Sequence, residues 1–178
     1  WESLAADEHL TLNSERYLPG SVQWQGEELQ EFVLPSVVSG SKYIDYPERM
    51  LPADDFIEFL GYMAGDGSLS RSGGNYPLRI TQCEERSYFE IKSCMEQLPF
   101  KLHIYDHAIA VNGAAILELC FFDKGLYTWI ECNLKTNSYD VHVPSFVKQL
   151  SRRQIQIFWD ACMATDGSTS KTHPNLQR

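Results

Sequence analysis

The spacing of apolar and polar residues predicts both helices and strands in this chain. Residues 54–65 are apolar on nearly every side of a helical turn, which is typical of a helix buried in a core. Residues 76–82 and 100–105 alternate between apolar and polar side chains, as strands with one buried face do. Residues 108–112 and 116–122 predict two further strands. The pattern therefore indicates an α+β fold.

Polar residues mark the starts of the predicted helices. Asp54 and Asp123 are N-cap candidates, because their side-chain oxygens can accept hydrogen bonds from the first exposed N–H groups. Ser87 and Ser151 are each followed three residues later by Glu or Gln, which is the spacing of a capping box. The last of these helices carries Trp159 among its apolar residues, and we expect that side chain in the core.

Two of the predicted helices end in the same way. Segments 59–68 and 159–168 are largely apolar and close on Asp-Gly-Ser, which places Asp66 and Asp166 100 residues apart. A repeat at this spacing indicates two related halves. Small residues allow two helix axes to approach closely, and each helix has two of them. These residues are Gly61, Ala64, Ala161 and Ala164.

The paired acids favour metal chemistry. If the two helices lie side by side and run in the same direction, Asp66 and Asp166 converge at one end of the pair. Two neighbouring carboxylates repel each other unless a cation lies between them. Mg²⁺ or Mn²⁺ suits such a site, because these ions take oxygen ligands and accept phosphate oxygens. A metal held in this way can orient a water molecule for phosphodiester hydrolysis.

The two segments resemble the paired motifs of LAGLIDADG homing endonucleases, in particular intein-embedded members of phage type. Residues 46–52 before the first motif and residues 143–146 before the second add to the resemblance. It implies an αββαββα half-domain repeated around two central motif helices, with the second half incomplete in this chain. The chain then divides into a lead-in (a candidate splicing-side segment or linker), a first half-domain and the start of a second half-domain, at residues 1–50, 51–150 and 151–178.

The resemblance also implies a function and a set of site residues. The function is a site-specific endonuclease that makes metal-dependent double-strand breaks, with double-stranded DNA as its partner. Asp66 and Asp166 are the implied catalytic metal ligands, and the backbone carbonyls of Gly65 and Thr165 complete a Mg²⁺ or Mn²⁺ site. The family's sheet lies in the DNA major groove, which implies base and phosphate contacts. The implied DNA-binding residues are Arg71, Arg79, Thr81, Lys101, His103 and Tyr105.

The chain departs from the family pattern near its second motif. Family members often carry a lysine just before an Ile-Pro or Val-Pro pair, and Val141 takes that place here. His142 is then a candidate catalytic base, while Lys135 and Lys148 are candidate replacements for the lysine. Only 12 residues follow Asp166, so we expect a second chain or a missing C-terminal segment to complete the second half. The first and last residues are not those of a self-splicing intein, and we expect no splicing.

The net charge of −9 is unevenly distributed. Residues 1–58 hold 12 of the 24 acidic residues and three of the 15 Lys and Arg residues, so the rest of the chain is neutral. A neutral remainder is compatible with a basic face for DNA. The five cysteines include no CxxC pair, which predicts reduced thiols of a cytoplasmic protein (in a bacterial or phage-infected cell) and no zinc site. No apolar stretch approaches the length of a membrane span.

Two other functions stay open from the residues alone. The first is a DNA-binding protein or intein remnant that keeps the fold without cutting, and Val141 in place of the lysine favours it. The second is a non-enzymatic interaction module in which the paired helices form only an interface. DNA binding separates the interaction module from the other two functions. Metal-dependent cutting separates the endonuclease from both alternatives.

Overall fold

The computed structural model describes residues 24–38, 45–71, 73–82, 85–107, 116–137 and 139–165. These residues form a mixed α+β fold, which confirms the predicted fold class at that level. The helices are α1 (Ala53–Gly65), α2 (Glu85–Gln97), α3 (Lys124–Asn133) and α4 (Arg152–Thr165), with a short 3-10 helix η1 (Val147–Gln149). The strands are β1 (Glu31–Leu34), β2 (Val37–Val38), β3 (Asp45–Tyr46), β4 (Arg49–Pro52), β5 (Gly67–Leu69), β6 (Pro77–Gln82), β7 (Leu102–His107), β8 (Ile116–Phe122), β9 (Lys135–Asn137) and β10 (Asp140–Val141). No helix in the described part of the chain is long and apolar enough to cross a membrane.

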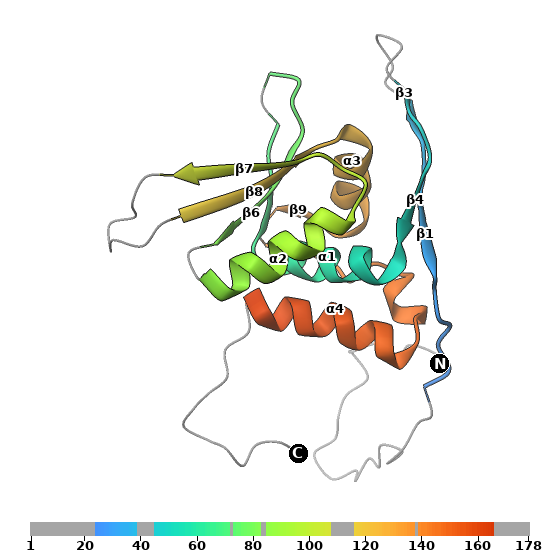
Figure 1. Cartoon of the computed structure of the whole chain (residues 1–178). Helices are drawn as coiled ribbons and strands as arrows, with labels where there is room; N and C mark the ends of the chain where they lie inside the picture. Colours follow the sequence, from blue (N-terminus) through green and yellow to red (C-terminus); the bar gives the residue numbers. More distant parts are fainter. Residues whose placement is uncertain are drawn as a thin grey trace, which may run out of the picture.

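The central sheet has four antiparallel strands in the order β5-β6-β8-β7. Successive residues of each strand point to opposite faces, so one face can be apolar and the other polar. On the inner face, Leu78, Ile80, Leu119 and Phe121 are fully buried. Figure 1 shows α1 and α2 beneath this sheet, with α4 on the far side of α1. The core therefore lies between the sheet and α1, where the rings of Phe59 and Phe121 have centroids 5.6 Å apart.

The described part of the lead-in packs against the helices. β1 pairs with β4 in an antiparallel ladder that crosses the expected boundary at residue 50. Phe32 on β1 inserts its ring among three others, with centroid distances of 4.6 Å to Phe56, 5.1 Å to Trp129 and 4.9 Å to Phe146. Aromatic contacts of this kind stabilise a core beyond the area that they bury. The segment before α1 thus contributes to the same core as the helices.

Most predicted elements are present. β8 has the predicted bounds, and β6 and β7 lie within two residues of theirs. The β5–β6 hairpin turns at Gly73 and Gly74, whose φ angles of 58° and 85° lie in the left-handed region that favours glycine. The strand predicted at residues 108–112 lies outside the described residues. The β9–β10 hairpin was not predicted, because its strands are too short to show an alternating pattern.

Two of the predicted helix starts are wrong. α1 begins at Ala53, so Asp54 lies in its first turn and does not cap it. α2 begins at Glu85, two residues before Ser87, so the capping box predicted there does not open the helix. Acidic residues in a first turn stabilise a helix through its dipole without being caps, and this makes the exact start hard to predict.

The other two predicted starts are confirmed. The side chain of Asp123 accepts a hydrogen bond from the backbone N–H of Leu126 at 2.8 Å and caps α3. Ser151 Oγ accepts from the backbone N–H of Gln154 at 3.2 Å at the start of α4. The amide of Gln154 does not complete a capping box, because it bonds to other parts of the chain.

Helices α1 and α4 run side by side in the same direction, which is the condition under which the acids that follow them would converge (Figure 1). They are in close contact at Gly61, where an added Cβ would lie 2.5 Å from both the Ala161 Cβ and the Phe158 carbonyl oxygen. The thiol of Cys162 also donates to the Gly61 carbonyl at 3.4 Å. The small residues at positions 61 and 161 therefore bring the two helix axes together.

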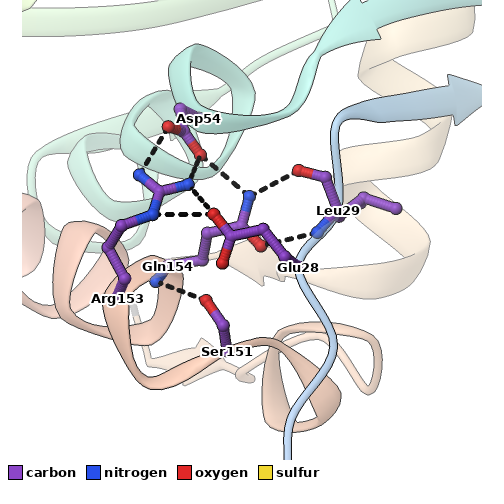
Figure 2. Close-up of polar contacts among 6 residues, drawn as sticks. All are labelled: Glu28, Leu29, Asp54, Ser151, Arg153 and Gln154. Atoms are coloured by element: carbon purple, nitrogen blue, oxygen red, sulfur yellow. Dashed lines mark hydrogen bonds and ion pairs between the residues drawn. The ribbon is translucent and has the colours of Figure 1, made fainter.

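The first turns of the two helices are joined by polar contacts, which Figure 2 shows. Gln154 is fully buried, and its Nε2 donates to Asp54 Oδ1 at 2.8 Å and to the Leu29 carbonyl at 2.6 Å. Its Oε1 accepts from the Leu29 N–H at 2.9 Å. Arg153 bridges Asp54 and Glu28, with distances of 2.6 Å and 2.7 Å. These contacts tie the lead-in, α1 and α4 together at one end.

Gly61→Ala is expected to lower the free energy of unfolding by about 1–3 kcal/mol, the usual cost of overpacking a core. Alanine otherwise stabilises a helix interior by about 1 kcal/mol relative to glycine, so the sign of the effect is the test. Urea denaturation followed by circular dichroism measures the change. A variant more stable than the parent would show that α4 does not lie against Gly61.

Two adjacent acids on α1 are expected to have opposite effects on stability. Hydrogen bonding to Arg153 lowers the pKa of Asp54 below its ordinary value of 3.8, so ionised Asp54 stabilises the fold above that pH. That stabilisation is lost as the pH falls through the lowered pKa. Burial, with the nearby charge of Asp54, raises the pKa of Asp55, so ionised Asp55 destabilises the fold at neutral pH.

At pH 7, Asp54→Asn should therefore lower the free energy of unfolding, by no more than about 1 kcal/mol for so exposed an ion pair, and Asp55→Asn should raise it. Denaturation curves at pH 7 and at pH 3 measure both variants. The difference between each variant and the parent should shrink at the lower pH. Equal effects of the two substitutions on the free energy of unfolding would contradict the opposite pKa shifts of Asp54 and Asp55.

Candidate active site

Asp66 lies at the C-terminal end of α1, where the chain turns into β5. Its backbone N–H donates to the Tyr62 carbonyl at 3.1 Å and closes the last helical turn. Its partly buried side chain accepts, through Oδ2, a hydrogen bond from Nε2 of Gln82 on β6. Gln82 is itself buried, on the inner face of the sheet. The sheet therefore holds in place the carboxylate that the sequence singled out.

A buried lysine lies at the same end of α1. Lys135, the first residue of β9, is 2% exposed, and its Nζ donates to the carbonyls of Met63, Ala64 and Gly67 at 3.1, 3.3 and 2.7 Å. The last carbonyls of a helix lack helical N–H partners and carry the negative end of the helix dipole. An ammonium group is favoured there. Lys135 thus bonds to the backbone on both sides of Asp66 in the sequence.

The position where the family carries a lysine lies opposite Lys135 across one hairpin. In the β9–β10 pair, Val141 is the partner of Lys135. A lysine is therefore present beside the expected place, on the neighbouring strand. His142 has a side chain that is 68% exposed and pairs with Asp140 at 2.7 Å. The described contacts of His142 do not include Asp66, and its role as a base stays a prediction.

The second motif helix ends at Thr165, and Asp166 lies outside the described residues. The hydroxyl of Thr165 donates to the Cys162 carbonyl at 3.0 Å, so it turns back onto its own helix. On α1, the carbonyls of Met63 and Ala64 accept from Lys135, and Gly65 is the next residue of the helix. The expected metal ligands are thus in part described, with Asp66 and Gly65 at the end of one helix and Thr165 at the end of the other.

These donors are all oxygen atoms, which is the ligand chemistry of Mg²⁺ and Mn²⁺. The described residues contain no group of three or more His, Cys, Asp or Glu side chains that could hold a metal ion. The expected site is of a different kind, because it combines two carboxylates with backbone carbonyls. Of its two carboxylates, only that of Asp66 belongs to the described residues. The metal therefore stays a prediction.

The outer face of the sheet gathers four of the six residues expected to contact DNA. Neighbouring strands place one row of side chains across β6, β8 and β7, formed by Arg79, Cys120 and His103. The next row is formed by Thr81, Glu118 and Tyr105. Since α1 and α2 cover the opposite face, these two rows point away from the core (Figure 1). The sequence pattern thus predicted which strand residues share a face.

The other two residues expected to contact DNA lie outside these rows. Arg71 follows β5, forms an ion pair with Glu131 and lies over the rings of Tyr76 and Tyr127, at 6.0 Å and 5.5 Å from their centroids. Lys101 is exposed immediately before β7. Both keep a positive charge at the margin of the sheet. Neither shares a row with Arg79.

The two central helices differ in what covers their outward faces. Here the outward face of each helix is the side that points away from the other helix. On α1 the residues of this face are all fully buried, and they are Phe56, Phe59, Leu60 and Met63. The residues 100 positions later on α4 are all exposed, and they are Gln156, Trp159, Asp160 and Met163. Trp159 is 58% exposed, so the prediction that it lies in the core is wrong. Among the described elements, α4 packs mainly against α1 and η1.

Gln82 is the site residue that the sequence analysis did not single out. It follows Leu78 and Ile80 at the inward positions of β6, so a polar residue in the apolar phase of the strand was the available signal. A scan of the chain against protein-family models and a search of curated proteins found no match. The function has to be inferred from the residues and their geometry.

Lys135→Met is expected to lower the free energy of unfolding by about 1–3 kcal/mol, because buried carbonyls at the end of α1 lose their donor. Lys148→Met removes the same charge from an exposed position beside α4 and should change stability by less than about 0.5 kcal/mol. Urea denaturation of both variants measures the difference. Equal stability of the two variants would show that the hydrogen bonds of Lys135 do not hold the end of α1.

Proposed function

We propose that this chain is the DNA-cutting part of a LAGLIDADG-type, intein-encoded homing endonuclease that makes site-specific breaks in double-stranded DNA. The parallel pairing of α1 and α4, with contacts between positions 100 residues apart, carries the proposal. Such pairing brings the C-terminal ends of the two helices, Gly65 and Thr165, to the same end of the pair. We expect the acid that follows each of them in the sequence to converge there. Two converging carboxylates can hold a metal ion that assists hydrolysis of a phosphodiester.

The residues around Asp66 each have a part in the proposed hydrolysis. Asp66 and Asp166 supply carboxylate oxygens, and the carbonyls of the residues before them add neutral ligands. When bound, Mg²⁺ or Mn²⁺ supplies Lewis-acid stabilisation of the phosphate and of the leaving oxygen. Gln82 restrains the orientation of the Asp66 carboxylate through its hydrogen bond. Lys135 places a positive charge beside the site, which offsets the repulsion between two carboxylates and an incoming phosphate.

Strand β6 connects this site with the proposed DNA surface. Gln82 points inward to Asp66, whereas Arg79 and Thr81 on the same strand point to the outer face. Side chains alternate between the two faces of a strand. DNA bound through the outward side chains of β6 would therefore have a phosphate close to the carboxylates, and the same side chains could contact bases. Lys101 at the margin of the sheet suits a phosphate contact, because it is charged and exposed. Arg71 lies at the same margin, but it is paired with Glu131, so a phosphate there would have to displace that carboxylate.

The proposal includes a second half that covers α4. Trp159 and Met163 leave apolar surface exposed on the outward side of the helix. A groove of about 790 Å³ beside them is lined by Trp24, Val143 and Phe158, among others. A second chain, or a longer version of this one, with a sheet like β5–β8 would bury that surface. It would also supply the contacts for the second DNA strand.

The decisive measurement is cleavage of a randomised double-stranded DNA library in Mg²⁺, in Mn²⁺ and in EDTA. We expect metal-dependent cutting at one site. Asp66→Asn should reduce it by at least about 100-fold, since a metal ligand is lost, and should preserve DNA binding. Glu96→Gln, which changes an exposed acid on α2, is the matched control and should cut like the parent.

Three other outcomes would contradict this function in different ways. Cutting that persists in Asp66→Asn would place the active site elsewhere. Specific DNA binding without cutting in either metal would indicate a DNA-binding protein or intein remnant that has lost catalysis. Neither binding nor cutting would favour an interaction module in which the helix pair is only structural.

A further inference from the structure

An ion pair lies at the centre of the outer face of the sheet. Arg79 is on β6 and Glu118 is on β8, the two interior strands. Nε of Arg79 lies 3.2 Å from Glu118 Oε1, and its Nη1 donates to Ser70 Oγ at 2.5 Å. The side chains of Arg79 and Glu118 are 32% and 18% exposed. The guanidinium is thus held from two sides while part of it still reaches solvent.

The hydrogen-bonding chemistry of these groups indicates what they can recognise. A guanidinium is a planar fork of five N–H donors, and its contacts with Glu118, Ser70 and the Cys120 thiol use only some of them. In the major groove, guanine O6 and N7 accept a bidentate pair of bonds from arginine, and the cytosine amino group donates to a carboxylate. A phosphate would be repelled by Glu118. The pair therefore suits the edge of a G·C base pair better than the DNA backbone.

We propose that Arg79 and Glu118 together read one G·C base pair, with Arg79 on the guanine and Glu118 on the cytosine amino group. The proposal rests on the proposed function, because it assumes that the outer face of the sheet binds DNA. Glu118 and Ser70 hold the arginine before DNA arrives, so its side chain loses less conformational freedom on binding. The negative charge of Glu118 also weakens the attraction of the protein to the phosphates of any DNA. A residue that lowers affinity for all DNA while favouring one base pair is typical of a specificity residue.

Selection from a randomised double-stranded DNA pool by the full chain, in EDTA to prevent cutting, measures the base preference at each position. We expect one position with a G·C preference of roughly 10-fold or more. Glu118→Gln keeps the size of the side chain and removes its charge. It should reduce the preference at that position by at least about 5-fold while affinity for the whole pool rises. Arg79→Lys, which keeps the charge without the fork, should lose the preference at the same position.

The matched control is Lys92→Gln on α2, on the opposite side of the sheet, which should leave the profile unchanged. If the parent binds DNA and the Glu118 and Arg79 variants alter different positions, or none, the inference fails while the proposed function stands. If the parent does not bind DNA, the proposed function fails and this inference fails with it.

Discussion

The close contact between Gly61 and Ala161 sets the distance between the two central helices, and the rest of the structure depends on that distance. A second contact, between Asp54 and Gln154, also joins positions 100 residues apart. Contacts between equivalent positions are what a local twofold axis between two parallel helices produces. Under that relation, the same residue of each helix comes to the same end of the pair. The proposed role of the repeated acid therefore depends on this pairing of the helices and not on the Asp-Gly-Ser sequence alone.

Three buried polar side chains connect the elements around the helix pair. Gln154 joins the lead-in to α1 and α4, Gln82 joins the sheet to Asp66, and Lys135 joins β9 to the end of α1. A buried polar group destabilises a fold unless it finds partners, and no buried side-chain nitrogen or oxygen among the described residues lacks one. Such contacts are directional, so they fix the orientation of a carboxylate more closely than apolar packing does.

Sequence pattern predicted what depends on local periodicity. The bounds of β8 follow from apolar spacing, and the small residues at positions 61 and 161 follow from the repeat. The parallel pairing of the two helices was only a condition of the metal hypothesis. The role of Lys135 did not follow, because a hairpin register places it opposite Val141 and at the end of a helix about 70 residues earlier in the sequence. Trp159 was predicted wrongly because periodicity identifies an apolar face and not what covers it.

The outward face of α4 adds a constraint on any surface that docks there. Its equivalent on α1 is wholly apolar, whereas α4 alternates Trp159 and Met163 with Gln156 and Asp160. Gln156 donates to Asp160 at 2.7 Å, so part of the polarity is satisfied within the helix. The remaining carboxylate oxygen would need a donor after burial, because an unpaired buried charge is strongly destabilising. A covering sheet therefore needs a polar or basic residue where it meets Asp160, whereas the equivalent residue of α1, Leu60, is fully buried in the hydrophobic core.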